Sequence, residues 1–289
     1  MSYEKTMAQL IEVNKTIDVC LEKLGRKPRT LKNFHRLMNQ GQRKLLPRVK
    51  EWMAESITEM RAGLPKMKGR TPAQKTKSIA DWKRIREQGV IILKPVILEL
   101  LGEGGKAVVE RGIMKQERFD IIGVEAVKWA STYCARLVTE ITDKTMKGIR
   151  AYIAAGINAG KSGPAIAREL RPLVGLTEKQ IFAVANYHEK LILERPEYTA
   201  VRQSEMAEVY ARRLHRDRAM LIAKSETREA LWEGVFEGYE QMGIEKVEGV
   251  SDPDACDWCL DNINGQVMTM AEARGVDTHP GCECAWVMA

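Results

Sequence analysis

The residues best suited to chemistry gather in the C-terminal tail. Four of the six cysteines and one of the four histidines fall there. Cys256 and Cys259 are separated by two residues, and His279 and Cys282 repeat that spacing. Two such pairs of sulfur and nitrogen donors, joined by a short loop, suit tetrahedral Zn²⁺. Cys284 lies two residues beyond Cys282, so either of these two cysteines can supply the fourth ligand.

Two other interpretations of this cluster stay open. Clustered cysteines can be small buried apolar residues, and they can form a disulfide. The N-terminus lacks the apolar segment of a signal peptide, so we expect a reducing, cytosolic origin that favours metal. Four protein ligands leave no open coordination position, so we expect a structural ion that stabilises residues 244–289, which are too few to bury a large core. Pro280 and Gly281 are expected to form the turn that joins His279 to Cys282.

The composition is that of a folded helical protein. Hydrophobic residues make up 44% of the 289 residues, which is ordinary for a globular chain, and only 10 prolines interrupt it. The longest apolar stretch, Val90–Leu101, contains Lys94, Pro95 and Glu99, so it predicts a core helix and not a membrane span.

Positive charge is concentrated at the start of the chain. Residues 1–90 carry a formal charge of +12 and residues 91–289 one of −5. A basic arm of this kind suits contact with nucleic acid, and equally a set of solvated helix faces, so no nucleic-acid-binding residue is assigned. In the second half, Arg212–Arg218 is the densest basic segment. There His215 either lies over a phosphate, pairs with a carboxylate or belongs to a solvated face.

Helical periodicity dominates the first part of the chain. It predicts one helix over residues 3–24, ended by Gly25. A second helix over residues 30–60 is expected to break near Leu46, because Pro47 removes a backbone hydrogen bond and clashes with the preceding turn.

The next segment begins with a basic loop over residues 63–70. Thr71 and the proline after it predict a helix start. This helix is expected to run to Gln88 and to resume as far as Leu101, with a bend at Gly89 or Pro95.

The second half is also helical. Apolar residues recur every three or four positions over 119–158, which predicts a long central helix with Cys134 as a packed core thiol. Ser162 predicts the cap of a short helix, and Thr177 with Gln180 forms a capping box. A further helix over residues 220–242 should stop at Gly243.

After Gly243 the pattern changes to short strands around the cysteine loops, at residues 244–250, 266–269 and 285–288. We therefore predict a mostly α fold, with an elongated multi-helix body and a small C-terminal α+β cap like a zinc knuckle. The predicted parts are a basic helical N-terminal region (1–110), a helical core (111–243) and the Cys/His-rich cap (244–289).

The tail resembles the end of a known protein family. Its motifs are, in order, Cys256-Asp-Trp-Cys259, Asn264-Gly-Gln-Val267 and His279-Pro-Gly-Cys282-Glu-Cys284. They look like the close of the phage minor head proteins, also called Mu F-like or head-morphogenesis proteins.

The middle of the chain extends this resemblance. Four segments are similar to the middle of minor head proteins: Asn158–Leu170, Val174–Ile181, Ala183–Tyr187 and Arg218–Glu226. Lys224 and Ser225 stand where the family often has Arg-Thr. The resemblance covers about residues 110–289, whereas the preceding region matches only in being helical and basic.

The resemblance implies a virion component and not an enzyme. Members of the family are low-copy proteins that associate with the portal vertex and enter the procapsid during assembly. We therefore expect the portal protein, and the major capsid protein or scaffold, as partners, with double-stranded DNA as a further one. The expected location is the capsid interior or portal vertex, after synthesis in the host cytoplasm, with no membrane in the mature particle.

Two alternatives come from other functional classes. One is a nucleic-acid-binding protein in which a zinc-stapled cap serves as a rigid platform. The other, less favoured, is a zinc-dependent nuclease or deaminase, which would need an open coordination position. No His-x-Glu precedes the cysteines as in a zinc deaminase, and only Asn262 and Asn264 lie near the cluster where an HNH-type nuclease needs further His or Asn. No catalytic residue is therefore assigned.

Overall fold

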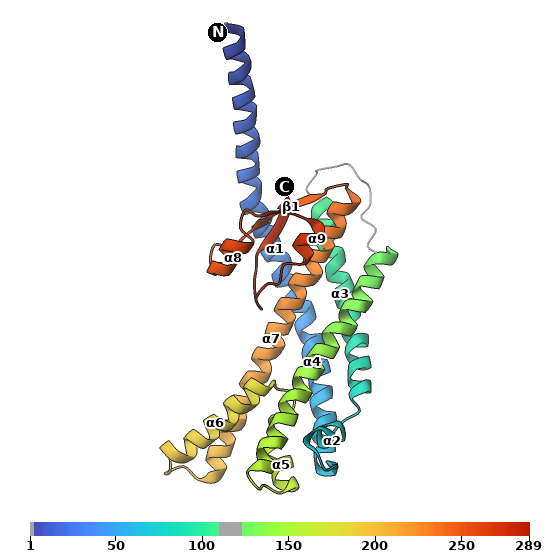
Figure 1. The fold of residues 1–289 in the computed structure, drawn as a ribbon, viewed down its shortest axis with the longest axis vertical. Helices are drawn as coiled ribbons and strands as arrows, with labels where there is room; N and C mark the ends of the chain where they lie inside the picture. Colours follow the sequence, from blue (N-terminus) through green and yellow to red (C-terminus); the bar gives the residue numbers. More distant parts are fainter. Residues whose placement is uncertain (1–2, 110–122) are drawn as a thin grey trace. The chain divides into compact units, whose positions relative to one another are not determined.

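The computed structural model describes the backbone of residues 3–109 and 123–289 and the side chains of residues 31–108 and 123–289. This part of the chain is mostly α-helical, with a small three-stranded sheet near the C-terminus (Figure 1). The prediction of a mostly α fold followed by a small α+β cap is confirmed. The helices, including one 3₁₀ turn (η1), are α1 (Tyr3–Gly63), η1 (Leu64–Lys66), α2 (Pro72–Lys77), α3 (Trp82–Val109), α4 (Val124–Asn158), α5 (Gly163–Leu170), α6 (Glu178–Glu194), α7 (Ala200–Gln241), α8 (Asp257–Asn262) and α9 (Met270–Arg274).

The chain divides into two compact units. Unit 1 comprises Met1–Gly41, Leu100–Ile121 and Thr227–Ala289, and unit 2 comprises Gln42–Glu99 and Ile122–Glu226. Both are discontinuous in sequence because α1, α3 and α7 each contribute residues to both. The sequence instead predicted three parts that follow one another along the chain, and that division stays a prediction. In the described part of the chain, no helix combines the length and the apolar composition that crossing a membrane requires.

Helix α1 is continuous, so the predicted end at Gly25 and the predicted break near Leu46 are wrong. A proline in a helix interior costs about 3 kcal/mol. Pro47 lies on the exposed side, however, and buried apolar residues continue in helical register around it. Their burial offsets the lost hydrogen bond. These residues are Phe34, Met38, Leu45, Val49 and Trp52.

The predicted helix from Thr71 to Gln88 is also divided differently. Thr71 caps α2 with a full capping box, as expected, but α2 ends at Lys77. The hydroxyl of Ser78 donates to the carbonyl oxygen of Lys68 at 3.0 Å and accepts from the Lys68 N–H at 2.9 Å, which ties the end of α2 to the preceding loop. Helix α3 then runs through Gly89 and Pro95 as a single element.

In unit 1, α3 and α7 touch through their backbones. A Cβ atom on Gly104 would lie 2.3 Å from the carbonyl oxygen of Leu231, and one on Gly234 would lie 1.9 Å from that of Leu101. The glycines therefore permit the close approach of the two helices. The predicted helix end at Leu101 is wrong, because the glycine cluster that follows it is part of α3 and makes this contact.

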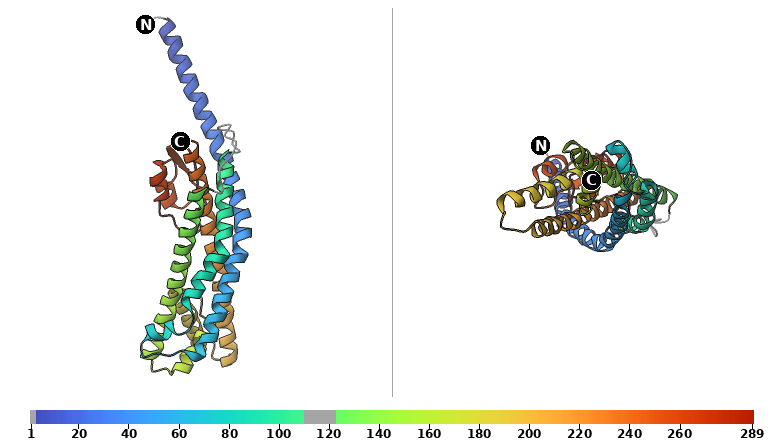
Figure 2. Two further views of the ribbon diagram at one scale, coloured as in Figure 1. Left: turned by 90° about the vertical axis from the view of Figure 1, so that its right-hand side faces the viewer. Right: turned by 90° about the horizontal axis from the view of Figure 1, so that it is seen from below.

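Helices α4, α5 and α6 of unit 2 follow the sequence prediction closely, whereas α7 begins at Ala200 and not at the predicted residue 220. Helix α4 matches the predicted central helix, whose first residues (119–122) lie outside the described part. Ser162 caps α5, and Thr177 caps α6 with a complete capping box. Helix α6 and the first part of α7 run antiparallel and side by side, with the rings of Tyr187 and Tyr210 5.1 Å apart (Figures 1 and 2).

The C-terminal segment forms the expected sheet. Its strands are β1 (Lys246–Val250), β2 (Val267–Thr269) and β3 (Ala285–Met288), in the antiparallel order β2-β1-β3. Gly243 has a φ of 72° and ends the turn after α7, as predicted. The sheet, α8 and α9 gather around the C-terminal part of α7 (Figure 1). There the ring of Trp286 lies 5.8 Å from that of Trp232 and 6.0 Å from that of Phe236.

The backbone contact between α3 and α7 gives a first prediction. We expect Gly234→Ala to lower the free energy of unfolding by about 2 kcal/mol or more, because the methyl group meets a carbonyl oxygen that cannot move aside. Gly163→Ala is the control, since nothing lies within 4 Å of a Cβ atom there. Thermal and chemical denaturation followed by circular dichroism measure both. If Gly234→Ala has the same free energy of unfolding as the parent, α3 and α7 do not pack as closely as this contact requires.

Candidate metal centre

The candidate ligands lie on three short segments of the cap. Cys256 is the N-cap residue of α8, and Cys259 lies within the same helix. His279 and Cys282 lie on a turn closed by a hydrogen bond of 3.3 Å from the Cys282 N–H to the His279 carbonyl. Gly281, with a φ of 82°, permits this turn, as the sequence predicted. Cys284 directly precedes β3.

All five predicted ligands come together around Cys259. One group of donors comprises Cys256, Cys259 and His279, and the other comprises Cys259, Cys282 and Cys284. Within each group the ligand atoms lie within 4.8 Å of one another. Cys259, Cys282 and Cys284 are buried, whereas Cys256 and His279 are exposed.

The spacing of these atoms suits a tetrahedral ion. With metal–sulfur bonds of about 2.3 Å, two ligand sulfurs of a tetrahedron lie about 3.8 Å apart, and a sulfur and a nitrogen lie about 3.6 Å apart. Cys259 Sγ lies 3.7 Å from Cys282 Sγ and 3.1 Å from His279 Nε2. These two distances are close to those of a tetrahedral site, and the remaining donors belong to the two groups that share Cys259.

The orientation of His279 also fits metal binding. Its Nδ1 lies 3.1 Å from the carbonyl oxygen of Pro280, which can only accept a hydrogen bond. The proton is therefore placed on Nδ1, and the lone pair of Nε2 faces Cys259. A ligating histidine commonly has its second nitrogen fixed in this way.

The thiols share their protons unequally. A hydrogen bond from the Cys284 thiol, with help from the charge of Arg228, lowers the pKa of Cys282 to about 5. Burial and the neighbouring charge on Cys282 raise the pKa of Cys259 to about 12. The hydrogen bond that Cys284 donates, followed by burial, raises the pKa of Cys284. Hydrogen bonding within the cluster therefore favours a thiolate on Cys282 over one on Cys259 or Cys284.

Two residues of α7 hold the ligand loop through its backbone. Trp232 Nε1 donates to the carbonyl oxygen of Cys284 at 3.0 Å, and an Arg228 amino group donates to that of His279 at 3.2 Å. The Arg228 guanidinium also lies over the Trp232 ring, 4.9 Å from its centroid. Sequence reasoning missed both residues. Their spacing of four places them on one helix face, but nothing local indicates that the tail covers it.

A second tie joins α9 to the same stretch of α7. Arg274 Nε lies 3.1 Å from a carboxylate oxygen of Glu233, and a terminal nitrogen lies 2.6 Å from one of Glu240. The guanidinium also lies 5.5 Å from the centre of the Phe236 ring. Burial raises the pKa of Glu233, while hydrogen bonding from Arg274 acts in the opposite direction. Removing Arg274 would thus leave a buried carboxylate unpaired.

A further donor group, also missed from the sequence, links α1 to the cap. His35 Nε2 lies 2.9 Å from Asp252 Oδ2 and 3.2 Å from the carbonyl oxygen of Glu283. The ligand atoms of His35, Asp252 and Glu283 lie within 4.8 Å of one another. Because the imidazole nitrogen is already engaged by two oxygens, we interpret this group as a polar contact that fixes the segment between Cys282 and Cys284.

No family model, no curated protein and no solved structure matches this chain. The chemistry of the site therefore rests on its own residues.

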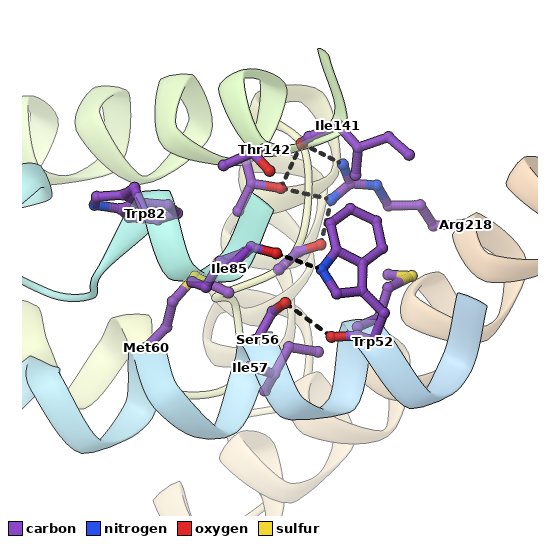
Figure 3. Close-up of a pocket in the computed structure, with 12 residues that line it drawn as sticks. Trp52, Ser56, Ile57, Met60, Trp82, Ile85, Ile141, Thr142 and Arg218 are labelled. Carbon is purple, nitrogen blue, oxygen red and sulfur yellow. Dashed lines mark hydrogen bonds between the residues drawn. The ribbon is translucent and has the colours of Figure 1, made fainter. Parts of the chain in front are cut away.

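Unit 2 contains a small cavity of about 30 Å³ beside the buried Arg218 (Figure 3). Arg218 donates to the carbonyl oxygens of Ile141 and Gly175 and to the hydroxyl of Thr145. Burial lowers the pKa of Arg218 to about 10, so the side chain stays charged at neutral pH. A volume of this size admits roughly one or two water molecules. The cavity is therefore too small for a substrate, and Arg218 serves to join α7 to α4.

Two other residues of unit 2 were considered from the sequence. Cys134 is fully buried, and burial raises its pKa to about 12, so the predicted core thiol is confirmed. Glu226, at the end of the last segment that resembles the family, accepts a hydrogen bond from the hydroxyl of Tyr133.

His215 adopts none of the arrangements expected for it. Its Nε2 lies 3.2 Å from the carbonyl oxygen of Pro172, and its Nδ1 is buried without a hydrogen-bond partner. Burial lowers the pKa of His215 below its ordinary value of 6.5, and the charges of Arg218 and Arg61 add to this effect. The ring is therefore neutral in the folded protein near neutral pH.

This environment predicts a pH dependence of stability. Because the folded-state pKa is lowered, the contribution of His215 is fully present above about pH 6.5 and is lost as the pH falls toward the folded-state value. We expect the free energy of unfolding to fall less between neutral pH and pH 5 in the His215→Gln variant than in the parent. Chemical denaturation at the two pH values measures this difference. His188→Gln, a change of a histidine of α6 in the same unit, is the control. An equal pH dependence in the His215 variant and the parent would contradict the assignment.

Proposed function

We propose that the C-terminal cluster binds one structural zinc ion, in a cap similar to a zinc knuckle. The proposed ligands are Cys256, Cys259, His279 and Cys282, with Cys284 as the alternative to Cys282. The observation that carries this proposal is that two groups of donors share Cys259, whose Sγ lies close to tetrahedral spacing from His279 Nε2 and from Cys282 Sγ. Sulfur and imidazole donors in this number are typical of structural zinc.

The same geometry favours an ion that stabilises the fold over one that performs turnover. Four protein ligands close the coordination shell and leave no position for a substrate. The cap shares its core with α7, so the ion would complete a structure that helical residues already support. Its binding free energy would then add to the stability of the loops that carry the ligands.

We further propose that the chain is a phage minor head protein, without enzymatic activity, in the capsid interior or at the portal vertex. The resemblance of the ordered motifs at 158–226 and 256–284 supports this, as does the combination of a mostly helical chain with a Cys/His cap. Its partners would be the portal protein and the major capsid protein or scaffold, with double-stranded DNA as a further contact. A nucleic-acid-binding protein outside a virion is the second candidate, favoured by the basic N-terminal region.

The zinc proposal predicts about one zinc ion per chain in protein purified under reducing conditions, measured by elemental analysis. Cys259→Ser should abolish zinc binding, because Cys259 belongs to both donor groups. Cys134→Ala is the matched control, since it removes a buried thiol of unit 2 and should leave the zinc content unchanged.

Serine variants of Cys282 and Cys284 identify the fourth ligand, because only the ligating residue should cause loss of the ion. Chelation should expose the 251–284 loops to protease while the helices remain. Protein without zinc, or a Cys259→Ser variant that retains it, would contradict the proposal.

The virion proposal predicts that the chain is present at low copy in purified particles of the phage that encodes it. Mass spectrometry of the particles detects the chain, and a tagged copy should recover the portal protein from the same lysate. An untagged lysate is the control. If purified particles contain the portal protein but not this chain, the chain is not a virion component.

A further inference from the structure

Unit 2 contains a second hollow that is lined by arginines. It has a volume of about 400 Å³ and lies between the end of α1, the η1 turn and α5. Arg61, Arg168 and Arg171 line it, together with small and apolar residues such as Leu64 and Ala167. None of the residues that line it is acidic.

None of the three guanidinium groups forms an ion pair with a carboxylate among the residues that the structure describes, although the charge of Arg168 helps to lower the pKa of Glu169. Arg61 Nε donates to the carbonyl oxygen of Arg171 at 3.0 Å, which fixes the side chain and leaves its terminal nitrogens available. All three residues are exposed. Some other exposed arginines of the unit, such as Arg48 and Arg136, pair with acids, whereas others, such as Arg84, form no ion pair among the described residues.

The hollow around Arg86 shows the contrast. That hollow, of about 770 Å³, is lined by Asp81 and Asp143 as well as by basic residues. Arg86 there lies 2.6 Å from Asp143. Acidic side chains therefore line that hollow and one of them pairs with Arg86, whereas the hollow around Arg61 is lined by three arginines and by no acidic residue.

Converging unpaired arginines favour an anionic ligand. The planar guanidinium presents paired donors that match the oxygens of a phosphate group. The exposed residues Lys66, at the end of η1, and Lys68 and Arg70, in the loop after it, continue the positive charge. A line of cations that extends beyond one hollow suits an extended polyanion better than a single small anion.

We propose that Arg61, Arg168 and Arg171 bind the phosphate backbone of double-stranded DNA. The choice of DNA rests on the proposed function as a minor head protein, whereas the site itself rests on the unpaired arginines. Such contacts would be independent of sequence and would weaken steeply with salt.

The test is fluorescence anisotropy with a labelled duplex and the full-length, zinc-loaded protein, from about 50 to 200 mM salt. The triple variant Arg61→Gln, Arg168→Gln and Arg171→Gln should bind at least about 10-fold more weakly, with a salt slope lower by about 2 to 3. The matched control removes the same charge from exposed arginines of unit 2 that pair with acids, namely Arg136→Gln, Arg202→Gln and Arg213→Gln. Its affinity should stay within about threefold of the parent.

Three results would overturn the proposal: no duplex binding by the parent at low salt, equal losses in the two triple variants, or complete competition by millimolar inorganic phosphate, which would indicate a small-anion site. The single variant Arg168→Gln keeps the test valid if the triple variant misfolds. The Arg168 side chain makes no hydrogen bond within the described structure, so its replacement should leave the fold intact and still weaken DNA binding.

The DNA site and the virion role can fail separately. A variant that loses DNA binding but still enters particles would show that the site is not needed for the virion role. If the parent protein binds DNA but is absent from particles, only the virion role is contradicted.

Discussion

The cap depends on the C-terminal part of α7, because a segment of its size cannot bury a sufficient core alone. Arg228 and Trp232 hold the backbone oxygens of the two ligand segments, and Trp286 packs against the same helix face. The cysteine loops are thus positioned by residues outside them. This arrangement differs from a free-standing zinc knuckle, in which the ion alone orders its ligands.

The local features of the fold were predictable from the sequence. The capping residues Ser162 and Thr177, the strand pattern after Gly243 and the ligand spacing of the tail each depend on neighbours within a few positions. The caps and the strands were placed correctly, and the donors of the tail lie together, while their role as ligands stays a prediction. The donor set of the candidate site could also be predicted, because metal-ligand spacing is a property of short segments.

The errors arose where a distant part of the chain decides the outcome. Pro47 and Gly104 would each end a helix by local preference, yet burial along α1 and the close contact with α7 override that preference. Arg218 and His215 belong to a basic segment of the sequence, for which a solvated helix face was one interpretation. Their burial follows from packing against the Pro172–Gly175 turn, which periodicity alone does not reveal.

The sharing of Cys259 between two donor groups has a consequence for how an ion is held. A tetrahedral ion held by four of five donors has a spare thiol next to its shell, since Cys282 and Cys284 both lie near Cys259. If an ion is bound there, either thiol could serve as the fourth ligand while the other three donors hold the ion. The identity of the fourth ligand could therefore change without release of the ion.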